Sequence, residues 1–183
     1  MNYELRIKKF KNTGFTLVET LVSISIFTVS LLGLMSVLAS GISNTNYAKN
    51  KTTASYLAQE GIEYVRNMRD SYVLRLGSSG WNQFRSNFDS CNSGSECGFN
   101  NSVSMDSNSF IEKCNQLNGC ALYINNGGYS SNGGGVNSGF VRKIYRDQSI
   151  GGDEVKIFIK VEWTQGSGNY SVIFSENLFN WIE

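Results

Sequence analysis

The longest feature of the hydrophobic pattern is an apolar run near the amino terminus. Between Phe15 and Ile42 the only charged residue is Glu19, and the 22 residues from 21 to 42 carry no charge at all. As an α-helix these residues extend over roughly 33 Å, which matches the hydrocarbon thickness of a bilayer. The run therefore predicts a membrane-spanning helix over residues 15–42.

The residues before this run are mostly basic. Residues 1–14 hold four basic side chains and one carboxylate, a net charge of +3. Basic residues beside a span stay in the cytoplasm, so we expect a cytoplasmic leader and an extracytoplasmic carboxyl terminus. A plain signal-anchor helix would fit this pattern. A secretory signal peptide is another alternative, because residues 37–39 offer a possible cleavage site before Ser40. The apolar region of such a peptide is usually shorter than this one.

A second apolar pattern continues the predicted helix over residues 43–76. Apolar or small residues recur there at intervals of three and four, which is the spacing of one helical face: Leu57, Gly61, Val65, Met68 and Tyr72. Polar and charged residues occupy the other faces. We expect the stripe to pack against a sheet, with Gly61 at a close contact, and Gly77 and Gly80 to end the helix.

The last part of the chain, residues 140–183, alternates with period two. Five apolar residues share one face between residues 155 and 163, and glycines at 166 and 168 allow a turn into a strand over residues 170–176. Residues 140–145 predict a third strand. An antiparallel sheet with one apolar face, packed on the long helix, gives an α+β fold.

Residues 77–139 are rich in Gly, Ser and Asn and predict mostly loops. We expect a short helix over residues 109–117 and a short strand over residues 121–125. All four cysteines lie in this region: Cys91, Cys97, Cys114 and Cys120. Outside the cytoplasm an even number of cysteines predicts disulfides, and among three connectivities we favour the local pairs. A zinc site is the alternative, although the C-x5-C spacing departs from its usual C-x2–4-C.

Composition and charge narrow the function classes. The sequence contains no histidine, which removes Ser-His and Cys-His catalysis and His-ligated zinc, and it has no P-loop. We therefore expect no enzyme, no cofactor and no resident metal. The formal net charge is +1, and it becomes −2 without residues 1–14, which argues against nucleic-acid binding. The tightest basic cluster in the predicted sheet is Arg142, Lys143 and Arg146.

The segment GFTLVETLVSISIFTVSLLGL, which follows the basic leader, resembles the amino terminus of type IV prepilins and pseudopilins with a class III leader. The resemblance implies a pilin-like fold, cleavage between Gly14 and Phe15 by a prepilin peptidase, and methylation of the new Phe15 amine. It also implies that Glu19 pairs with that amine in a neighbouring subunit. The residues alone leave open that Glu19 merely reaches the inner membrane interface.

The carboxyl-terminal residues 153–156, 161–163 and 178–181 are similar to those of minor pilins and other pilin-like proteins. The similarity favours a minor pilin or pseudopilin of a type IV pilus or type II secretion-like filament. Such a subunit is held in the inner membrane, is assembled with other pilin subunits by a membrane platform, and ends at the cell surface. A membrane-anchored extracytoplasmic binding protein that never polymerises and a DNA-uptake pilus receptor are the alternatives.

Overall fold

A computed structural model describes residues 14–100, 103–104, 107, 109–131, 133–147 and 152–181. The predicted basic leader, apart from Gly14, lies outside these residues. The internal contacts divide the chain into two compact units, with the division between Asn46 and Tyr47.

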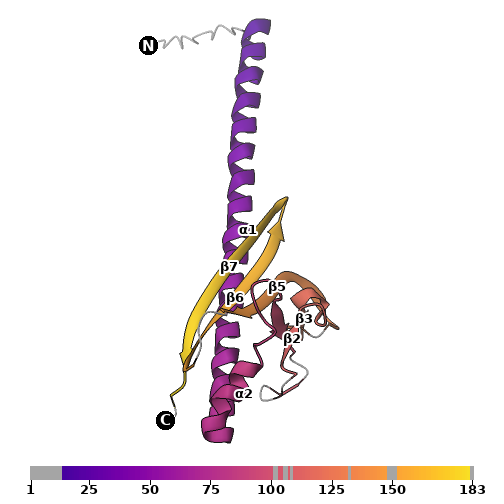
Figure 1. The fold of residues 1–183 in the computed structure, drawn as a ribbon. Coiled ribbons are helices and arrows are strands. Elements are labelled where there is room, and N and C mark those ends of the chain that lie inside the picture. The colour runs from indigo at the N-terminus through magenta and orange to yellow at the C-terminus, as the bar shows by residue number, and fades with distance from the viewer. Residues whose placement is uncertain are drawn as a thin grey trace, which may run out of the picture. The chain divides into compact units, whose positions relative to one another are not determined.

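Helix α1 extends over Leu17–Leu76 and belongs to both units (Figure 1). Gly77 follows it with a φ of 59°, a left-handed conformation that ends an α-helix, which confirms the predicted end. A 3-10 turn, η1 (Gly77–Ser79), then leads into α2 (Gly80–Ser86). Gly80, expected to end the helix together with Gly77, is instead the first residue of α2, with helical φ and ψ of −63° and −38°. The sequence did not predict α2, whose side chains Trp81 and Phe84 are buried.

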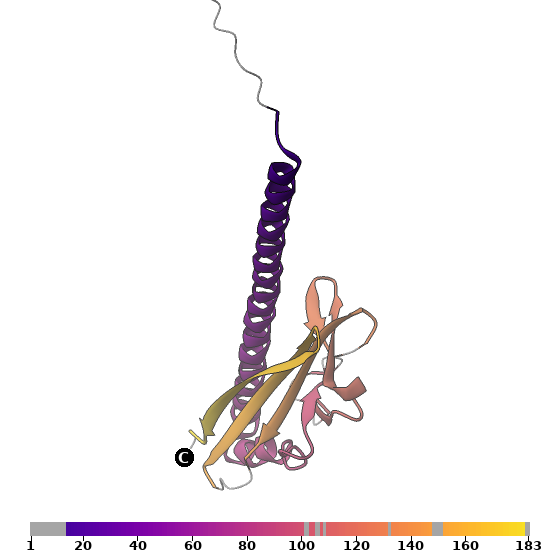
Figure 2. The same ribbon diagram turned by 90° about the horizontal axis from the view of Figure 1, so that it is seen from above.

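Seven strands form one antiparallel sheet within the described part of the chain. The strands are β1 (Cys97–Phe99), β2 (Ile111–Lys113), β3 (Ala121–Asn125), β4 (Gly128–Ser130), β5 (Val136–Arg146), β6 (Glu154–Gln165) and β7 (Gly168–Phe179). Strand β5 pairs with β6, and β6 pairs with β7 (Figure 2). The other edge of β5 is shared, because β3 pairs near its start and β1 pairs at Ile144. Strands β4 and β2 lie outside β3 and β1.

This arrangement confirms the predicted α+β fold and corrects one predicted element. Residues 121–125 form β3 as expected, and the three predicted carboxyl-terminal strands lie within β5, β6 and β7. The helix expected over residues 109–117 is wrong, because Ile111 pairs with Phe99 in a two-stranded ladder and a turn follows. Phe110 and Ile111 are buried there at 3% and 7% exposure, so packing overrides the weak local helix signal.

In the second unit, the predicted stripe of α1 packs on the apolar face of the sheet. Leu57, Val65, Met68 and Tyr72 are buried, as are the alternating residues of β6 from Val155 to Trp163. A Cβ atom at Gly61 would lie 3.0 Å from Cγ2 of Ile159. The absence of a side chain at Gly61 therefore lets the helix approach β6, as the sequence predicted.

Candidate processing and assembly site

The amino-terminal end of α1 carries the residues predicted for cleavage and assembly. Residues 14–16 are irregular, and the helix begins at Leu17. The side chain of Phe15 is 77% exposed. The Gly14–Phe15 peptide bond therefore lies outside the helix, in an irregular and exposed segment that a protease could reach.

Glu19 takes part in a hydrogen-bond pair at this helix end. The Glu19 N–H donates to Thr16 Oγ1 at 3.3 Å, and the Thr16 N–H donates to a Glu19 carboxylate oxygen at 3.5 Å. This reciprocal arrangement is a capping box, which satisfies amide groups that the first helical turn leaves unpaired. Our sequence interpretation missed this role for Thr16, although the T-x-x-E spacing is its known signal.

The cap constrains what Glu19 can do in an assembly. Its contact with the Thr16 N–H is at the outer limit of hydrogen-bond length, and the carboxylate is exposed. Hydrogen bonds between ionised partners are shorter and stronger than this one. A cationic partner could therefore bind Glu19 without breaking a strong internal contact.

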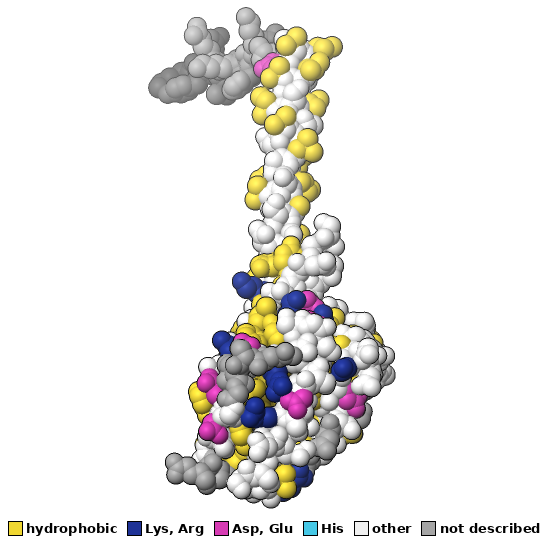
Figure 3. Space-filling model, viewed as in Figure 1, with side chains coloured by type: hydrophobic (Ala, Val, Ile, Leu, Met, Phe, Trp, Pro, Cys, Tyr) yellow, Lys and Arg dark blue, Asp and Glu magenta, His cyan; other side chains and the backbone are white. Residues whose placement is uncertain are grey.

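The first unit leaves the apolar surface of its helix uncovered. Sixteen large apolar side chains from Phe15 to Ile42 are each at least 40% exposed. Figure 3 shows apolar side chains along the visible face of this part of α1. By length and composition, this is the one helix among the described residues that could span a membrane. Because each such side chain is worth roughly 1.5–3 kcal/mol when buried, this helix requires a nonaqueous environment. It is suited to anchor the chain in a membrane.

Five hydroxyl groups in the first part of this helix need no external partner. Each of five hydroxyl side chains donates to the backbone carbonyl three or four residues earlier, at 2.8–2.9 Å: Thr20, Ser23, Ser25, Thr28 and Ser30. Such internal bonds remove the cost of placing a hydroxyl in hydrocarbon. Over residues 17–30, contacts between two such helices would therefore depend on shape and apolar packing, and Glu19 is the one charged group there that could add specificity.

In the second unit, the predicted basic cluster of β5 is divided between the two faces of the sheet. The Arg142 side chain is 1% exposed and faces α1, where Nη1 donates to Leu57 O at 3.2 Å and to Glu60 at 2.5 Å. Its guanidinium also lies over the rings of Tyr64 and Phe99, at 5.3 and 5.1 Å. Burial, together with the hydrogen bond and charge of Glu60, raises the pKa of Tyr64.

The other two members of the cluster are paired with acids. Lys143 lies on the opposite sheet face and binds Glu162 at 2.8 Å, and Lys160 binds the same carboxylate at 2.6 Å. Burial tends to raise the pKa of Glu162, but the hydrogen bonds from these two lysines lower it below its usual value. Arg146 pairs with Asp89 at 2.8 Å. The three basic residues therefore do not form one free cationic surface.

The four cysteines form two disulfides, which confirms that the region is cross-linked. Cys91 bonds to Cys97, and Cys114 bonds to Cys120, the local pairing among the three connectivities. The first bridge joins the segment after α2 to β1, and the second closes the turn between β2 and β3. Because all four sulfurs are bonded in pairs, none is a thiolate available to zinc.

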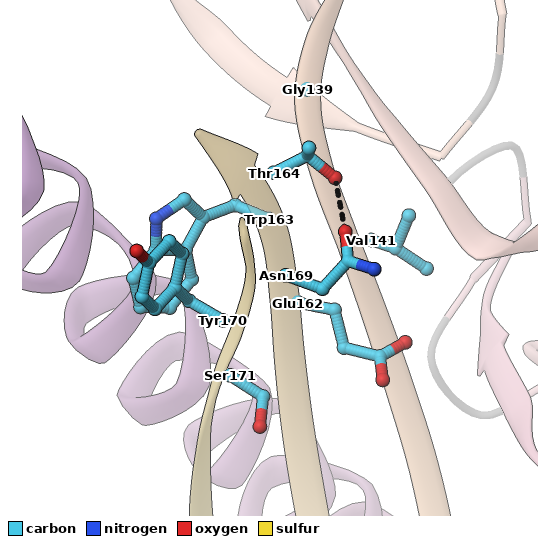
Figure 4. A pocket seen from close by; sticks show the side chains of 8 residues that line it. All are labelled: Gly139, Val141, Glu162, Trp163, Thr164, Asn169, Tyr170 and Ser171. Carbon is cyan, nitrogen blue, oxygen red and sulfur yellow. Dashed lines mark hydrogen bonds between the residues drawn. The ribbon is translucent and has the colours of Figure 1, made fainter. Parts of the chain in front are cut away.

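A shallow depression lies near the β6–β7 turn (Figure 4). Thr164 donates a hydrogen bond to Asn169 at 2.9 Å, and Glu162 is already held by two lysines. Trp163 and Tyr170 stack with ring centroids 5.7 Å apart. Among the side chains around this depression, no hydrogen bond joins a nucleophile to a base.

Comparison with known proteins identifies the amino-terminal segment. Residues 9–42 match the family described as the prokaryotic N-terminal methylation motif. No curated protein and no solved structure matches the chain. The matched segment includes Gly14, Phe15 and Glu19 and the exposed apolar part of α1. Together with that helix, the motif is consistent with a type IV prepilin or pseudopilin.

Proposed function

We propose that this prepilin-type chain is a structural subunit, a minor pilin or pseudopilin, of a type IV pilus or type II secretion-like filament. The observation that carries the proposal is the methylation motif on a helical segment, residues 15–42, whose large apolar side chains are exposed and whose only charged side chain is Glu19. Such a helix fits a membrane before assembly and a bundle of like helices afterwards.

In this function, a prepilin peptidase cuts the Gly14–Phe15 bond on the cytoplasmic side. The new Phe15 amine is then methylated, which keeps it basic. Its positive charge attracts Glu19 of a neighbouring subunit, and this ion pair sets the position of one helix against the next. In a low-dielectric environment an ion pair is much stronger than in water, so one contact can fix the register.

The amino terminus of the mature protein tests this proposal most directly. Mass spectrometry of the protein from its native host should find N-methyl-Phe15 as the first residue. A protein that retains Met1 would indicate a plain membrane anchor, and a start at Ser40 would indicate ordinary signal-peptide cleavage. Either result contradicts the proposal.

Two substitutions separate the assembly role of Glu19 from its capping role. Glu19→Ala should strongly reduce incorporation into filaments while membrane insertion is preserved. Thr16→Ala removes the hydroxyl of the cap but keeps the carboxylate, so it should assemble nearly as well as the wild type. If both variants assemble equally poorly, Glu19 acts through the helix cap and the pairing mechanism is wrong.

The paired basic residues argue against the DNA-receptor alternative. Arg142 is buried, and Lys143 and Arg146 each bind a carboxylate, so these three residues cannot together track a phosphate backbone. A membrane anchor that never polymerises is a separate alternative. The filament assay distinguishes it, because such a chain would be absent from filaments even without the Glu19→Ala substitution.

A further inference from the structure

Strand β7 has one edge without a partner among the described strands. It pairs with β6 along its whole length, from Gly168 opposite Gln165 to Phe179 opposite Glu154, without a register shift. Figure 2 shows β7 as the last strand beside β6. A long, regular edge of this kind is a template for pairing with another strand.

The turn before β7 determines which backbone groups face outward. Gln165 and Gly168 close a two-residue turn in which Gly166 has a φ of 60°, so they form a hydrogen-bonded pair. Hydrogen-bonded and non-bonded pairs alternate along an antiparallel ladder. The odd-numbered residues from Asn169 to Phe179 therefore direct their N–H and C=O groups away from β6.

The features that usually protect an edge strand are missing from β7. The sequence contains no proline, and the only charged residue of β7 is Glu176. That carboxylate is bound by Arg66 of α1, which leaves no free charge along the strand. Ile173, at the middle of β7, is 51% exposed. Natural edges commonly carry lysine, proline or a bulge at such a position.

The residues of β7 that direct their backbone groups outward form a palindromic sequence. Read from either end, the odd positions spell Asn-Ser-Ile-Ser-Asn: Asn169, Ser171, Ile173, Ser175 and Asn177. All five side chains are exposed. Two antiparallel copies centred on Ile173 would therefore place Ile opposite Ile, Ser opposite Ser and Asn opposite Asn.

This register is also compatible at the intervening positions. Val172 would lie opposite Phe174 of the second copy, and Glu176 would lie opposite Tyr170, so no like charges meet. The five outward pairs would exchange about ten backbone hydrogen bonds, two for each hydrogen-bonded pair. Matching polar and apolar cross-strand pairs stabilise such a ladder.

We propose that a second copy of this chain docks on β7 by antiparallel edge pairing about a two-fold axis at Ile173. The two sheets then continue into one another through the pair of β7 strands. A two-fold interface uses the same surface on both subunits and closes after two copies. The axis is perpendicular to the sheets, so the parts of α1 that pack on them run in opposite directions in the two copies. The contact is therefore distinct from the parallel helix bundling that builds a filament; it joins copies from different filaments or membranes, and its test does not depend on the proposed function.

Engineered cysteines test both the pairing and its register in the full chain, purified in detergent micelles. All four native cysteines are in disulfides, so one introduced cysteine is the only free thiol. Ile173→Cys should form a disulfide-linked dimer on mild oxidation, since hydrogen-bonded residues lie about 5.5 Å apart at Cα, within disulfide range. Its yield should exceed that of Val136→Cys, a residue 75% exposed elsewhere, by at least about tenfold.

The register predicts a more specific result for the two serines. Ser171→Cys and Ser175→Cys should each cross-link poorly alone but efficiently when the two variants are mixed. Adding Ile173→Glu to both should abolish that cross-link, because two carboxylates would meet at the axis. Within one subunit the new carboxylate would face Lys160, so the fold can accommodate it.

The experiment is repeated with Glu19→Ala to remove the proposed contact between helices. Cross-linking at Ile173→Cys should be unchanged in that background. A cross-link that requires Glu19 would show that stem contacts bring the heads together, and it would overturn the edge-pairing proposal. Equal yields from Ile173→Cys and Val136→Cys, or equal yields from the serine variants alone and mixed, would overturn it as well.

Discussion

Substitution of Arg142 separates the stabilising and destabilising effects of a buried cation. Its side chain is 1% exposed, and only Nη1 is hydrogen-bonded, to Leu57 O and Glu60. The other two nitrogens, Nε and Nη2, are buried without a hydrogen-bond partner among the described residues. Burying these two nitrogens without hydrogen bonds is destabilising. The cation–π contacts of Arg142 with the Tyr64 and Phe99 rings offset part of this cost, at about 0.5–2 kcal/mol each.

We expect Arg142→Ala to lower the free energy of unfolding by about 3 kcal/mol. The substitution leaves Glu60 without its cation and opens a cavity between α1 and β5. The estimate lies at the lower end of the range for buried pairs because the Glu60 side chain is 37% exposed. Arg142→Met also leaves Glu60 without its cation, but that carboxylate is 37% exposed and still accepts a hydrogen bond from the Tyr64 hydroxyl. Because Met keeps most of the volume and removes the unsatisfied nitrogens, we expect it to cost about 1 kcal/mol, well below the cost of Arg142→Ala.

Urea unfolding of the detergent-solubilised chain, with its disulfides intact, measures these differences. Trp81 and Trp163 are 3% and 4% exposed, so their fluorescence reports the loss of the core. Lys143→Met on the same strand is the matched control. Its ion pair is partly exposed, and its loss should cost less than about 1 kcal/mol. If Arg142→Met were as unstable as Arg142→Ala, the hydrogen bonds of Nη1 would be the main stabilising contribution, and our reasoning would be refuted.

Three further predictions concern the same unit. The free energy of unfolding should fall on acidification, because the folded protein lowers the pKa of Glu162. The ionised Glu162 contributes its full stabilisation above pH 4.5, and this stabilisation is lost as the pH falls through the folded-state pKa. Urea titrations at several pH values should show a weaker pH dependence for Glu162→Gln than for the wild type. Replacing Cys114 and Cys120 by Ser should lower the free energy of unfolding by about 2 kcal/mol. Replacing Cys91 and Cys97 by Ser should lower it further, because the two disulfide loops are equally long but Cys91 and Cys97 are both fully buried. Gly80→Ala should lower the melting temperature measurably, because the new Cβ would lie 2.3 Å from Tyr72 O, whereas Gly94→Ala should not, because the nearest atom lies 3.7 Å away.

The elements with strong periodicity could be predicted from the sequence. The uncharged run and the stripe that follows it determine α1, and strict alternation determines β6. Even the close approach at Gly61 followed from a glycine placed on the buried face of a helix. These patterns are sufficient to predict the elements because the spacing of apolar residues shows which side of each element is buried.

The region between α1 and β5 could not be predicted in the same way. Strands β1 and β2 have three residues each, too few for a period to appear, and they depend on pairing with each other and with β5. The role of Arg142 was also hidden. Its neighbours Lys143 and Arg146 suggest a surface cluster in the sequence, and only the contact with Glu60 of α1 shows that it is buried. Thr16, in contrast, could have been found from its spacing to Glu19.

In the proposed filament, the internally bonded hydroxyl groups of the first unit would affect how neighbouring helices slide. Because these groups are satisfied within each helix, sliding one helix along another by a full turn of about 5.4 Å breaks no hydrogen bond made by them and exchanges apolar contacts for similar ones. With Glu19 paired as we propose, one ion pair per subunit is the main barrier to such stacking faults. Subunits that lack the carboxylate should therefore build fibres with irregular axial spacing wherever they are incorporated at all.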